Sequence, residues 1–321
     1  MLLSHFVAWT FPVSMMVLGA GVVSAQTYPN KSIRLLTNGV GGGADFVARM
    51  IAQGLTGSLG QQVVVDNRPN GTIPTEIVAK AAPDGYTLHL NSNGMWTLPL
   101  LRSRVPYDPV RDFLPITLAT RTLNVLIVHP SLRVTSVREL IALAKSRPGE
   151  LNYASGGTGS AMHLGIALFT SMAGVNIAHV PYKANSLAVN DLISGQVQMT
   201  IVSAGSVMQH VKGGRLKALA ITSAQPSTLF PDLPTVAASG LPGYESATVY
   251  AVFAPAKTSE AIVTRLNQDI VRVINREDVK EKFFNAGIES IGSSPEQLAA
   301  TIKSEMAKMG KVIKNAGMRD D

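Results

Sequence analysis

The sequence predicts an α/β protein built from two domains. Strand-like and helix-like segments alternate through the chain with short connections, a pattern typical of largely parallel sheets covered by helices. The chain has 321 residues, which is long enough for two domains with separate cores. A strand, a glycine-rich loop and a helix follow one another twice, at 35–50 and at 153–169. This recurrence indicates two similar domains, each of which presents a helix N-terminus.

The first half of the chain begins with a strand and a glycine loop. A helix is expected from Phe46 to about Ser58, with Asp45 as its N-cap and Gly60 at its end. A short helix from Thr75 should end at a Pro-Asp-Gly turn. The strands predicted in this half cover 32–38, 62–67 and 86–92.

The second half repeats the alternation. Ser136 and Glu139 have the spacing of a capping box for a helix over 137–147. Thr258 or Ser259 starts another helix, and Ser294 precedes the last one. The strands predicted here cover 124–130, 151–155, 176–182, 197–203, 216–222 and 247–256.

The composition excludes several classes of function. There is no cysteine, so a thiol nucleophile, a disulfide framework and a cysteine-ligated zinc site are all excluded. The formal net charge is +7, but the lysines and arginines are scattered and aromatic residues make up only 6% of the chain. A nucleic-acid partner is therefore not expected.

The first 25 residues differ from the rest of the chain. They are almost entirely apolar and end in Val23-Ser24-Ala25, a small-residue cleavage pattern. We interpret residues 1–25 as a secretory signal peptide that is cleaved after Ala25. The alternative is an uncleaved membrane anchor, although Pro12 interrupts the apolar run.

The two glycine loops do not match the nucleotide-binding motifs. Neither loop has the lysine of a Walker loop. Gly39 and Gly41 begin a dinucleotide-like pattern, and Asp66 follows at a suitable distance, but Ala44 and Asp45 stand near the position of the last glycine. Loops that open onto a helix N-terminus remain natural anion sites.

Catalytic and metal-binding motifs are sparse. Neither a G-x-S-x-G nor an H-E-x-x-H motif is present. His163 follows Ser160 by three residues, so it could act as a base for that hydroxyl, as in a hydrolase. The competing interpretation is that Ser160 caps a helix and His163 packs. No cofactor and no metal site are predicted.

Several segments, taken together, identify a family. They include "GGGADFVARMIAQGL" at 41–55, "AKAAPDGYTL" at 79–88, "VPYDPVRDFLPI" at 105–116 and "VPYKANSLAVNDLISGQVQM" at 180–199. These segments resemble the periplasmic solute-binding proteins of tripartite tricarboxylate transporters, also called Bug receptors. The resemblance covers nearly the whole chain from Tyr28 onward.

This resemblance implies a two-lobed periplasmic binding protein of the Venus-flytrap, type II-like fold, with a ligand cleft between the lobes. Residues 26–123 with 253–321 would form the first lobe, and 124–252 the second. The family binds small carboxylates, which are held by backbone N–H groups of the two glycine loops. Glycines would let the anion approach without a side chain in the way.

The resemblance also implies the ligand-binding residues. Residues from both loops and from four neighbouring strand ends should line the cleft. The expected set is Asn38, Gly39, Gly41, Gly42, Gly43, Ala44, Asp45, Ser92, Asn93, Ser155, Gly156, Gly157, Thr158, Gly159, Ser160, His163, Tyr182, Lys183, Ser203, Ala204 and Tyr250.

Some positions depart from the family pattern. Asn38-Gly39-Val40 stand where the family usually has prolines, and Ser203-Ala204 stand where it often has Asp-Asn. Trp96, which follows the expected cleft wall, either packs in the core or stacks on an aromatic acid.

The functional prediction is a non-enzymatic periplasmic receptor. It would be a monomer that captures a small organic acid and delivers it to the membrane permease subunits of the transporter. The alternatives are a ligand-sensing module for a signalling partner and a hydrolase that uses Ser160 and His163.

Overall fold

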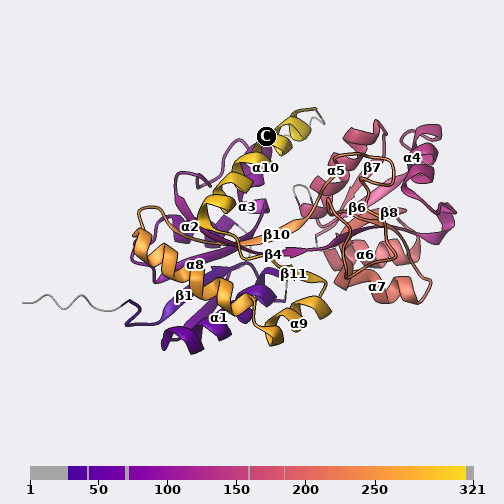
Figure 1. Cartoon of the computed structure of the whole chain (residues 1–321). Coiled ribbons are helices and arrows are strands. Elements are labelled where there is room, and N and C mark those ends of the chain that lie inside the picture. The colour runs from indigo at the N-terminus through magenta and orange to yellow at the C-terminus, as the bar shows by residue number, and fades with distance from the viewer. Residues whose placement is uncertain (1–27, 42, 69–71, 158–159, 184, 316–321) are drawn as a thin grey trace, which may run out of the picture.

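The computed structural model describes residues 28–41, 43–68, 72–157, 160–183 and 185–315. The predicted signal peptide lies outside these residues. Two lobes, each with its own sheet, lie side by side (Figure 1). They are connected at the centre of the molecule by the chain that leaves β4 (Phe113–Thr122) and by the chain that enters β10 (Thr248–Pro255). The predicted two-lobed α/β fold is thus confirmed.

The first lobe contains a six-stranded sheet in the order β11-β4-β10-β3-β1-β2. Strands β1, β2 and β3 are parallel, whereas β10 runs antiparallel to both β3 and β4. Its strands are β1 (Ile33–Thr37), β2 (Val63–Asn67), β3 (Thr87–Ser92), β4 (Phe113–Thr122), β10 (Thr248–Pro255) and β11 (Ile288–Ser290). Its helices are α1 (Gly43–Leu59), α2 (Thr72–Ala79), α3 (Gly94–Leu101), α8 (Glu260–Ile274), α9 (Glu277–Asn285) and α10 (Pro295–Asn315).

The second lobe contains a five-stranded sheet in the order β7-β6-β8-β5-β9. Strands β6, β7 and β8 are parallel, and β5 is antiparallel to its neighbours β8 and β9. Its strands are β5 (Asn124–Val128), β6 (Asn152–Ser155), β7 (Ala178–Pro181), β8 (Met199–Ser203) and β9 (Lys217–Ile221). Its helices are η1 (Pro130–Leu132), α4 (Val137–Ser146), α5 (Ala161–Ala173), α6 (Asn185–Ser194) and α7 (Ala204–Lys212).

The core of the first lobe follows from the alternation of side chains along its strands. Leu35 and Val252 face α1 and α8, whereas their neighbours Leu36 and Phe253 join the cluster on the other face, with α3 and α10. All four are at most 1% exposed. The central strands are therefore apolar on both faces, as expected for a sheet covered on two sides.

The two sets of parallel strands end close to the connection between the lobes. Ser92, the last residue of β3, pairs with Tyr250 near the start of β10. Strand β10 begins at Thr248, which pairs with Thr122 at the end of β4. Immediately after β4, Asn124 begins β5 and pairs with Ser203, the last residue of β8. The carboxyl ends of strands in both lobes therefore point toward the connecting segments.

Two central elements were not predicted. Strand β4 contains Pro115, which cannot donate a ladder hydrogen bond, but the structure has a register shift in the β10 ladder next to that residue. Helix α3 begins with Gly94 and contains Pro99, both of which argue against a helix in the sequence. Both elements form because they pack on the apolar core described above.

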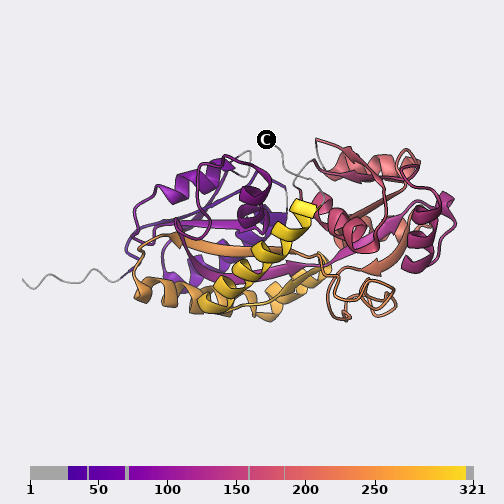
Figure 2. The ribbon, with the colours of Figure 1, turned by 90° about the horizontal axis from the view of Figure 1, so that it is seen from above.

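The predicted lobe limits stay a prediction. In the structure, β10 belongs to the six-stranded sheet from Thr248 onward. The end of α10 comes close to the second lobe, where Ile313 packs with Leu164 of α5 (Figure 2). Within the part of the chain that is described, no helix has the length and apolar character needed to span a membrane.

Candidate ligand-binding site

The first glycine loop follows β1 and is held by Asp45. The carboxylate of Asp45 accepts the N–H of Gly41 at 2.9 Å, and it also accepts Asn67 Nδ2 and Arg49 Nε at 2.9 Å each. Gly41 has a φ of 83°, which favours glycine. The prediction that Asp45 is the N-cap of the helix was wrong, because the residue lies within the first turn of α1 and reaches back to the loop.

The charge of Asp45 is satisfied within the protein. Burial alone would raise the pKa of Asp45, but the hydrogen bonds from Gly41, Arg49 and Asn67 outweigh it and hold this pKa below its usual value. The side chain is therefore a buried carboxylate that supports the loop. In this structure the N–H of Gly41 is already donated to it.

A group of asparagines adjoins the same loop. Asn38 Nδ2 donates to Asn91 Oδ1 at 3.1 Å, and Asn67 Nδ2 donates to the carbonyl of Asn38 at 2.7 Å. Asn38 Oδ1 is buried and has no hydrogen-bond partner among the described residues. Sequence reasoning missed Asn67 and Asn91; the available signal was their place near the carboxyl ends of β2 and β3, the two parallel strands on either side of β1.

Tyr250 closes the other side of the first loop. Its hydroxyl lies where a Cβ of Gly43 would stand, so this part of the loop packs directly on β10. Burial raises the pKa of Tyr250 to about 12, so the phenol is neutral at physiological pH. Gly39, by contrast, faces open space, and Gly42 lies outside the described residues. Ala44 is buried in α1.

The second glycine loop follows β6. Ser155 is fully buried, and its hydroxyl lies 2.6 Å from His179 Nε2 and accepts the N–H of Gly157 at 3.2 Å. Gly157 has a φ of 112°, and a Cβ on Gly156 would collide with the side chain of Asn185. The backbone conformation therefore favours glycine at 157, whereas at 156 the constraint is the neighbouring Asn185 side chain. Thr158 and Gly159 lie outside the described residues.

Ser160 and His163 behave as structural residues. Ser160 is the N-cap of α5, and its hydroxyl accepts the backbone N–H of His163 at 3.2 Å. The His163 ring stacks on that of His179, with centroids 4.1 Å apart and planes inclined by 7°. Burial, with a smaller contribution from His179, lowers the pKa of His163 to about 4. The geometry favours the capping interpretation over a Ser–His catalytic pair.

The remaining candidates of the second lobe differ in exposure. Tyr182 donates its hydroxyl to Asp191 at 2.7 Å, whereas Lys183 is exposed. Ser203 is half-buried at the start of α7. Ala204 is fully buried, and its N–H donates to the carbonyl of Leu123 at 2.9 Å. Ala204 therefore supports the connection between the lobes and offers no surface to a ligand.

Ser92 and Asn93 lie at the end of β3, beside the connecting strands. Ser92 is half-buried and pairs with Tyr250. Asn93 donates through Nδ2 to the carbonyl of Ala247 at 3.1 Å, while its Oδ1 is buried without a hydrogen-bond partner among the described residues. The alternative in which Trp96 stacks on a ligand was wrong, because its side chain is 0% exposed and donates to Glu305 at 2.8 Å.

The site has no metal-binding character in the described part of the chain, where no group of three or more His, Asp or Glu side chains could hold an ion. What it provides is two glycine turns, each followed by a helix N-terminus, together with amide and hydroxyl groups. This set of groups suits an anion held by neutral donors.

Comparisons with known proteins identify the family of this chain. A family model described as the tripartite tricarboxylate transporter family receptor matches residues 47–318. Protein BugT of Bordetella pertussis is 37% identical to this chain over 308 residues, which are 94% of each protein.

Solved structures share both the fold and the sequence. The structure of Rpa4515 of R. palustris with adipate is 37% identical, with a TM-score of 0.81, and the match covers 90% of this chain and 98% of that one. MatC (Rpa3494) from Rhodopseudomonas palustris with bound malate is 27% identical, with a TM-score of 0.77 and coverage of 89% and 100%. The family consists of periplasmic substrate-binding receptors and not of enzymes. The chain therefore belongs to the receptor family of the tripartite tricarboxylate transporters.

Proposed function

We propose that the chain captures a small organic acid between its lobes and delivers it to the membrane permease subunits of a tripartite tricarboxylate-type transporter. The observation that carries this proposal is the position of the strand ends. The carboxyl ends of parallel strands in both lobes point toward the connecting segments, and two of these ends, at Thr37 and Ser155, lead into glycine turns. Ligands of open α/β sheets bind outside such ends.

The proposed contacts are mainly backbone N–H groups. A carboxylate between the two turns would accept N–H groups from 38–43 and 155–160 other than those of Gly41 and Gly157, which are donated to Asp45 and Ser155. The helix dipoles of α1 and α5 would favour its charge. Ser92 and Tyr250 would border this space from the first lobe, and Tyr182 and Lys183 from the second. The adipate and malate bound by the two R. palustris relatives support a dicarboxylate as ligand.

We further propose that the protein acts in the periplasm as a monomer, after cleavage following Ala25. The division of the lobes at 124 and 253 would let them close over the ligand by a hinge motion in the connecting segments. Lobe closure would remove water from the carboxylate and strengthen each hydrogen bond to it.

The test is a thermal-shift and calorimetric titration of residues 26–321 with adipate and malate, with 1,6-hexanediol as the uncharged control. A ligand at a hundred times its Kd stabilises the fold by about 2.7 kcal/mol, a shift in Tm of roughly 5 °C. Gly157→Asp should abolish the shift, because it places a carboxylate in the second turn. Gly174→Asp, at the far end of α5 where a Cβ has open space, is the matched control.

The control should bind as the unchanged protein does. An unchanged Tm with every acid, on folded and ligand-free protein, would contradict the proposal. If the Gly157→Asp variant binds the acid as well as the unchanged protein, the ligand does not bind at the second turn.

A further inference from the structure

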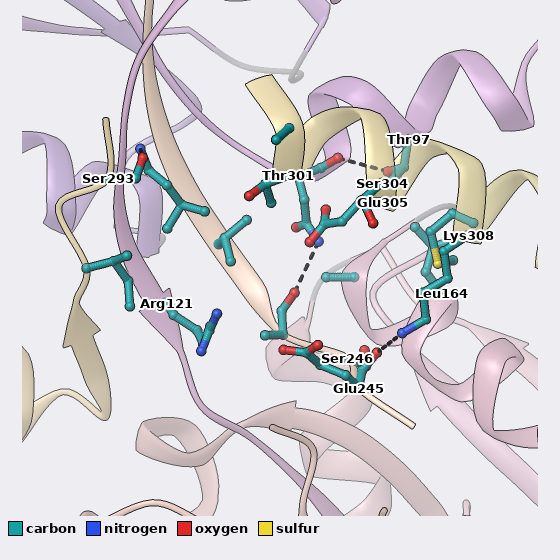
Figure 3. Close-up of a pocket in the computed structure, with 18 of the residues that line it drawn as sticks. Thr97, Arg121, Leu164, Glu245, Ser246, Ser293, Thr301, Ser304, Glu305 and Lys308 are labelled. Carbon is teal, nitrogen blue, oxygen red and sulfur yellow. Dashed lines mark hydrogen bonds between the residues drawn. The ribbon is translucent and has the colours of Figure 1, made fainter. Parts of the chain in front are cut away.

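A second cavity lies on the opposite side of β10 from the glycine loops. It has a volume of about 670 Å³ and is bordered by α3, α5 and α10 (Figure 3). Val249 lines this cavity, whereas the next residue, Tyr250, packs against Gly43 of the first loop. Successive residues of a strand face opposite sides of the sheet. The cavity is therefore separate from the site proposed above, and Asn93 is the residue common to both sets.

One arginine at the cavity forms no ion pair with the described residues. Arg121 enters it from β4 (Figure 3), and its Nε is buried with no hydrogen-bond partner in the described part of the chain. Among the ion pairs of the described residues, none within 4.0 Å includes Arg121. A buried donor that lacks an acceptor costs free energy unless a ligand or water supplies one.

The cavity also holds anionic and neutral acceptors. Glu245 lines it from the segment before β10, and its carboxylate likewise forms none of the ion pairs of the described residues. Asn93 Oδ1 is buried without a hydrogen-bond partner there. Opposite charges thus line one space and do not pair with each other.

Two further charged groups at this cavity already have partners. Glu305 accepts the indole N–H of Trp96 at 2.8 Å, and Lys308 donates to the carbonyl of Glu245 at 3.2 Å. Lys308 enters from α10, on the side of the cavity opposite Arg121 (Figure 3). The rest of the wall is mixed. Its hydroxyl and amide groups come from Thr97, Ser246, Ser293, Gln297, Thr301 and Ser304, and its apolar side chains include Leu118, Leu164, Leu168, Val249, Ile291 and Met309.

This combination indicates the kind of molecule that would fit. A simple anion would satisfy Arg121 but would lie near the carboxylates of Glu245 and Glu305. A simple cation would satisfy Glu245 but would lie near the positive charges of Arg121 and Lys308. A molecule with both charges would satisfy Arg121 and Glu245 together, and an apolar body would cover the leucine-rich wall. The volume lies in the range of small-molecule sites.

We propose that this cavity is a second binding site, which takes a small zwitterion of the α-amino-acid type with an apolar side chain. Its carboxylate accepts hydrogen bonds from the Arg121 guanidinium, including Nε. Its ammonium group donates to Glu245 and to Asn93 Oδ1. Because the cavity is bordered by α5 of one lobe and by α3 and α10 of the other, such a ligand contacts both lobes.

The test is isothermal titration of residues 26–321 with L-leucine, L-methionine and L-phenylalanine, in the absence and presence of saturating adipate. Two analogues of leucine probe the two charges: 4-methylpentanoate lacks the ammonium group, and 3-methylbutylamine lacks the carboxylate. We expect one of the amino acids to bind at a 1:1 ratio, also with adipate present, and both analogues to bind at least about tenfold more weakly, since each loses a charge-assisted hydrogen bond.

Variants separate this site from the acid site. Arg121→Met and Glu245→Gln should each weaken amino-acid binding by about tenfold or more and leave adipate binding unchanged. Gly157→Asp should weaken adipate binding and leave amino-acid binding unchanged. Arg133→Met, which removes an exposed arginine at a distance from the cavity, is the matched control.

Three outcomes would overturn the inference: no heat from any of the three amino acids at millimolar concentration, competition between amino acid and adipate, or unchanged amino-acid binding in both cavity variants. If the protein binds an amino acid but not adipate, the result contradicts the proposed function and still supports this second site.

Discussion

The hydroxyl group of Tyr250 occupies the place that a Cβ of Gly43 would need. This contact joins the N-terminus of α1 to the strand that connects the lobes, and it explains why a glycine stands there. The glycine is required by close packing of a neighbouring ring, and its φ is not in the left-handed region. At Gly157, with a φ of 112°, the requirement is conformational.

Gly43→Ala should therefore destabilise the protein by about 1–3 kcal/mol, because the new methyl group collides with the Tyr250 hydroxyl. Adding Tyr250→Phe removes that oxygen, so the double variant should regain part of the loss. Urea unfolding of the two single variants and the double variant measures the coupling. If the losses of unfolding free energy in the two single variants simply add up in the double variant, the contact between Gly43 and Tyr250 is not the cause of the destabilisation.

Acidic pH should weaken the second lobe through His163. Its pKa is lowered from 6.5 to about 4 in the folded protein, chiefly by burial. The unfolded chain therefore binds a proton first, and stability falls as the pH drops from about 6.5 toward 4, with a limit of about 3 kcal/mol. His89, whose pKa burial also lowers to about 4, contributes in the same direction.

Unfolding free energies at pH 7 and pH 4.5, compared with those of His163→Phe, measure this contribution. The variant should lose less stability over that range than the unchanged protein. Equal losses in the two proteins would assign the acid sensitivity to other groups, and NMR titration of the His163 ring would then show an ordinary pKa.

The sequence was informative where structure is local. Ser136 caps its helix as predicted, since its hydroxyl accepts the N–H of Glu139 at 3.2 Å; the Glu139 carboxylate, however, accepts from Thr135 instead of completing the capping box. Ser160 caps α5, and the strand over 32–38 forms as β1. Each of these features depends on residues within a few positions of one another, and their spacing is visible in the sequence.

Features that depend on distant residues were not predicted. Strand β4 forms around Pro115 because β10, more than a hundred residues later, shifts its register beside it. Trp96 is fixed by Glu305 of α10, which the sequence gives no reason to place nearby. The contact of Asp45 with Asn67 was not predicted either, because Asn67 belongs to another element, strand β2.

Asp45→Ala should loosen the first glycine loop. The change removes the acceptor of the Gly41 N–H, of Asn67 and of Arg49 together, so we expect a loss of about 1–3 kcal/mol of stability. Adipate affinity should fall as well, because the loop loses its support. Urea unfolding and calorimetry measure the two effects; Asp84→Ala, at an exposed salt bridge, is the control. Full adipate affinity in Asp45→Ala would separate this loop from the ligand.

The fluorescence of Trp96 should distinguish the two sites. In residues 26–321 it is the sole tryptophan, and it is fully buried with its indole N–H on Glu305, which lines the second cavity. An ammonium group bound near Glu245 and Glu305 changes the field on the indole directly, so the amino acid that binds there should shift its emission. Glu305→Gln should reduce that shift, because a neutral amide replaces the carboxylate. A shift with adipate that equals or exceeds the amino-acid shift would mean that Trp96 reports lobe closure instead of occupation of the cavity.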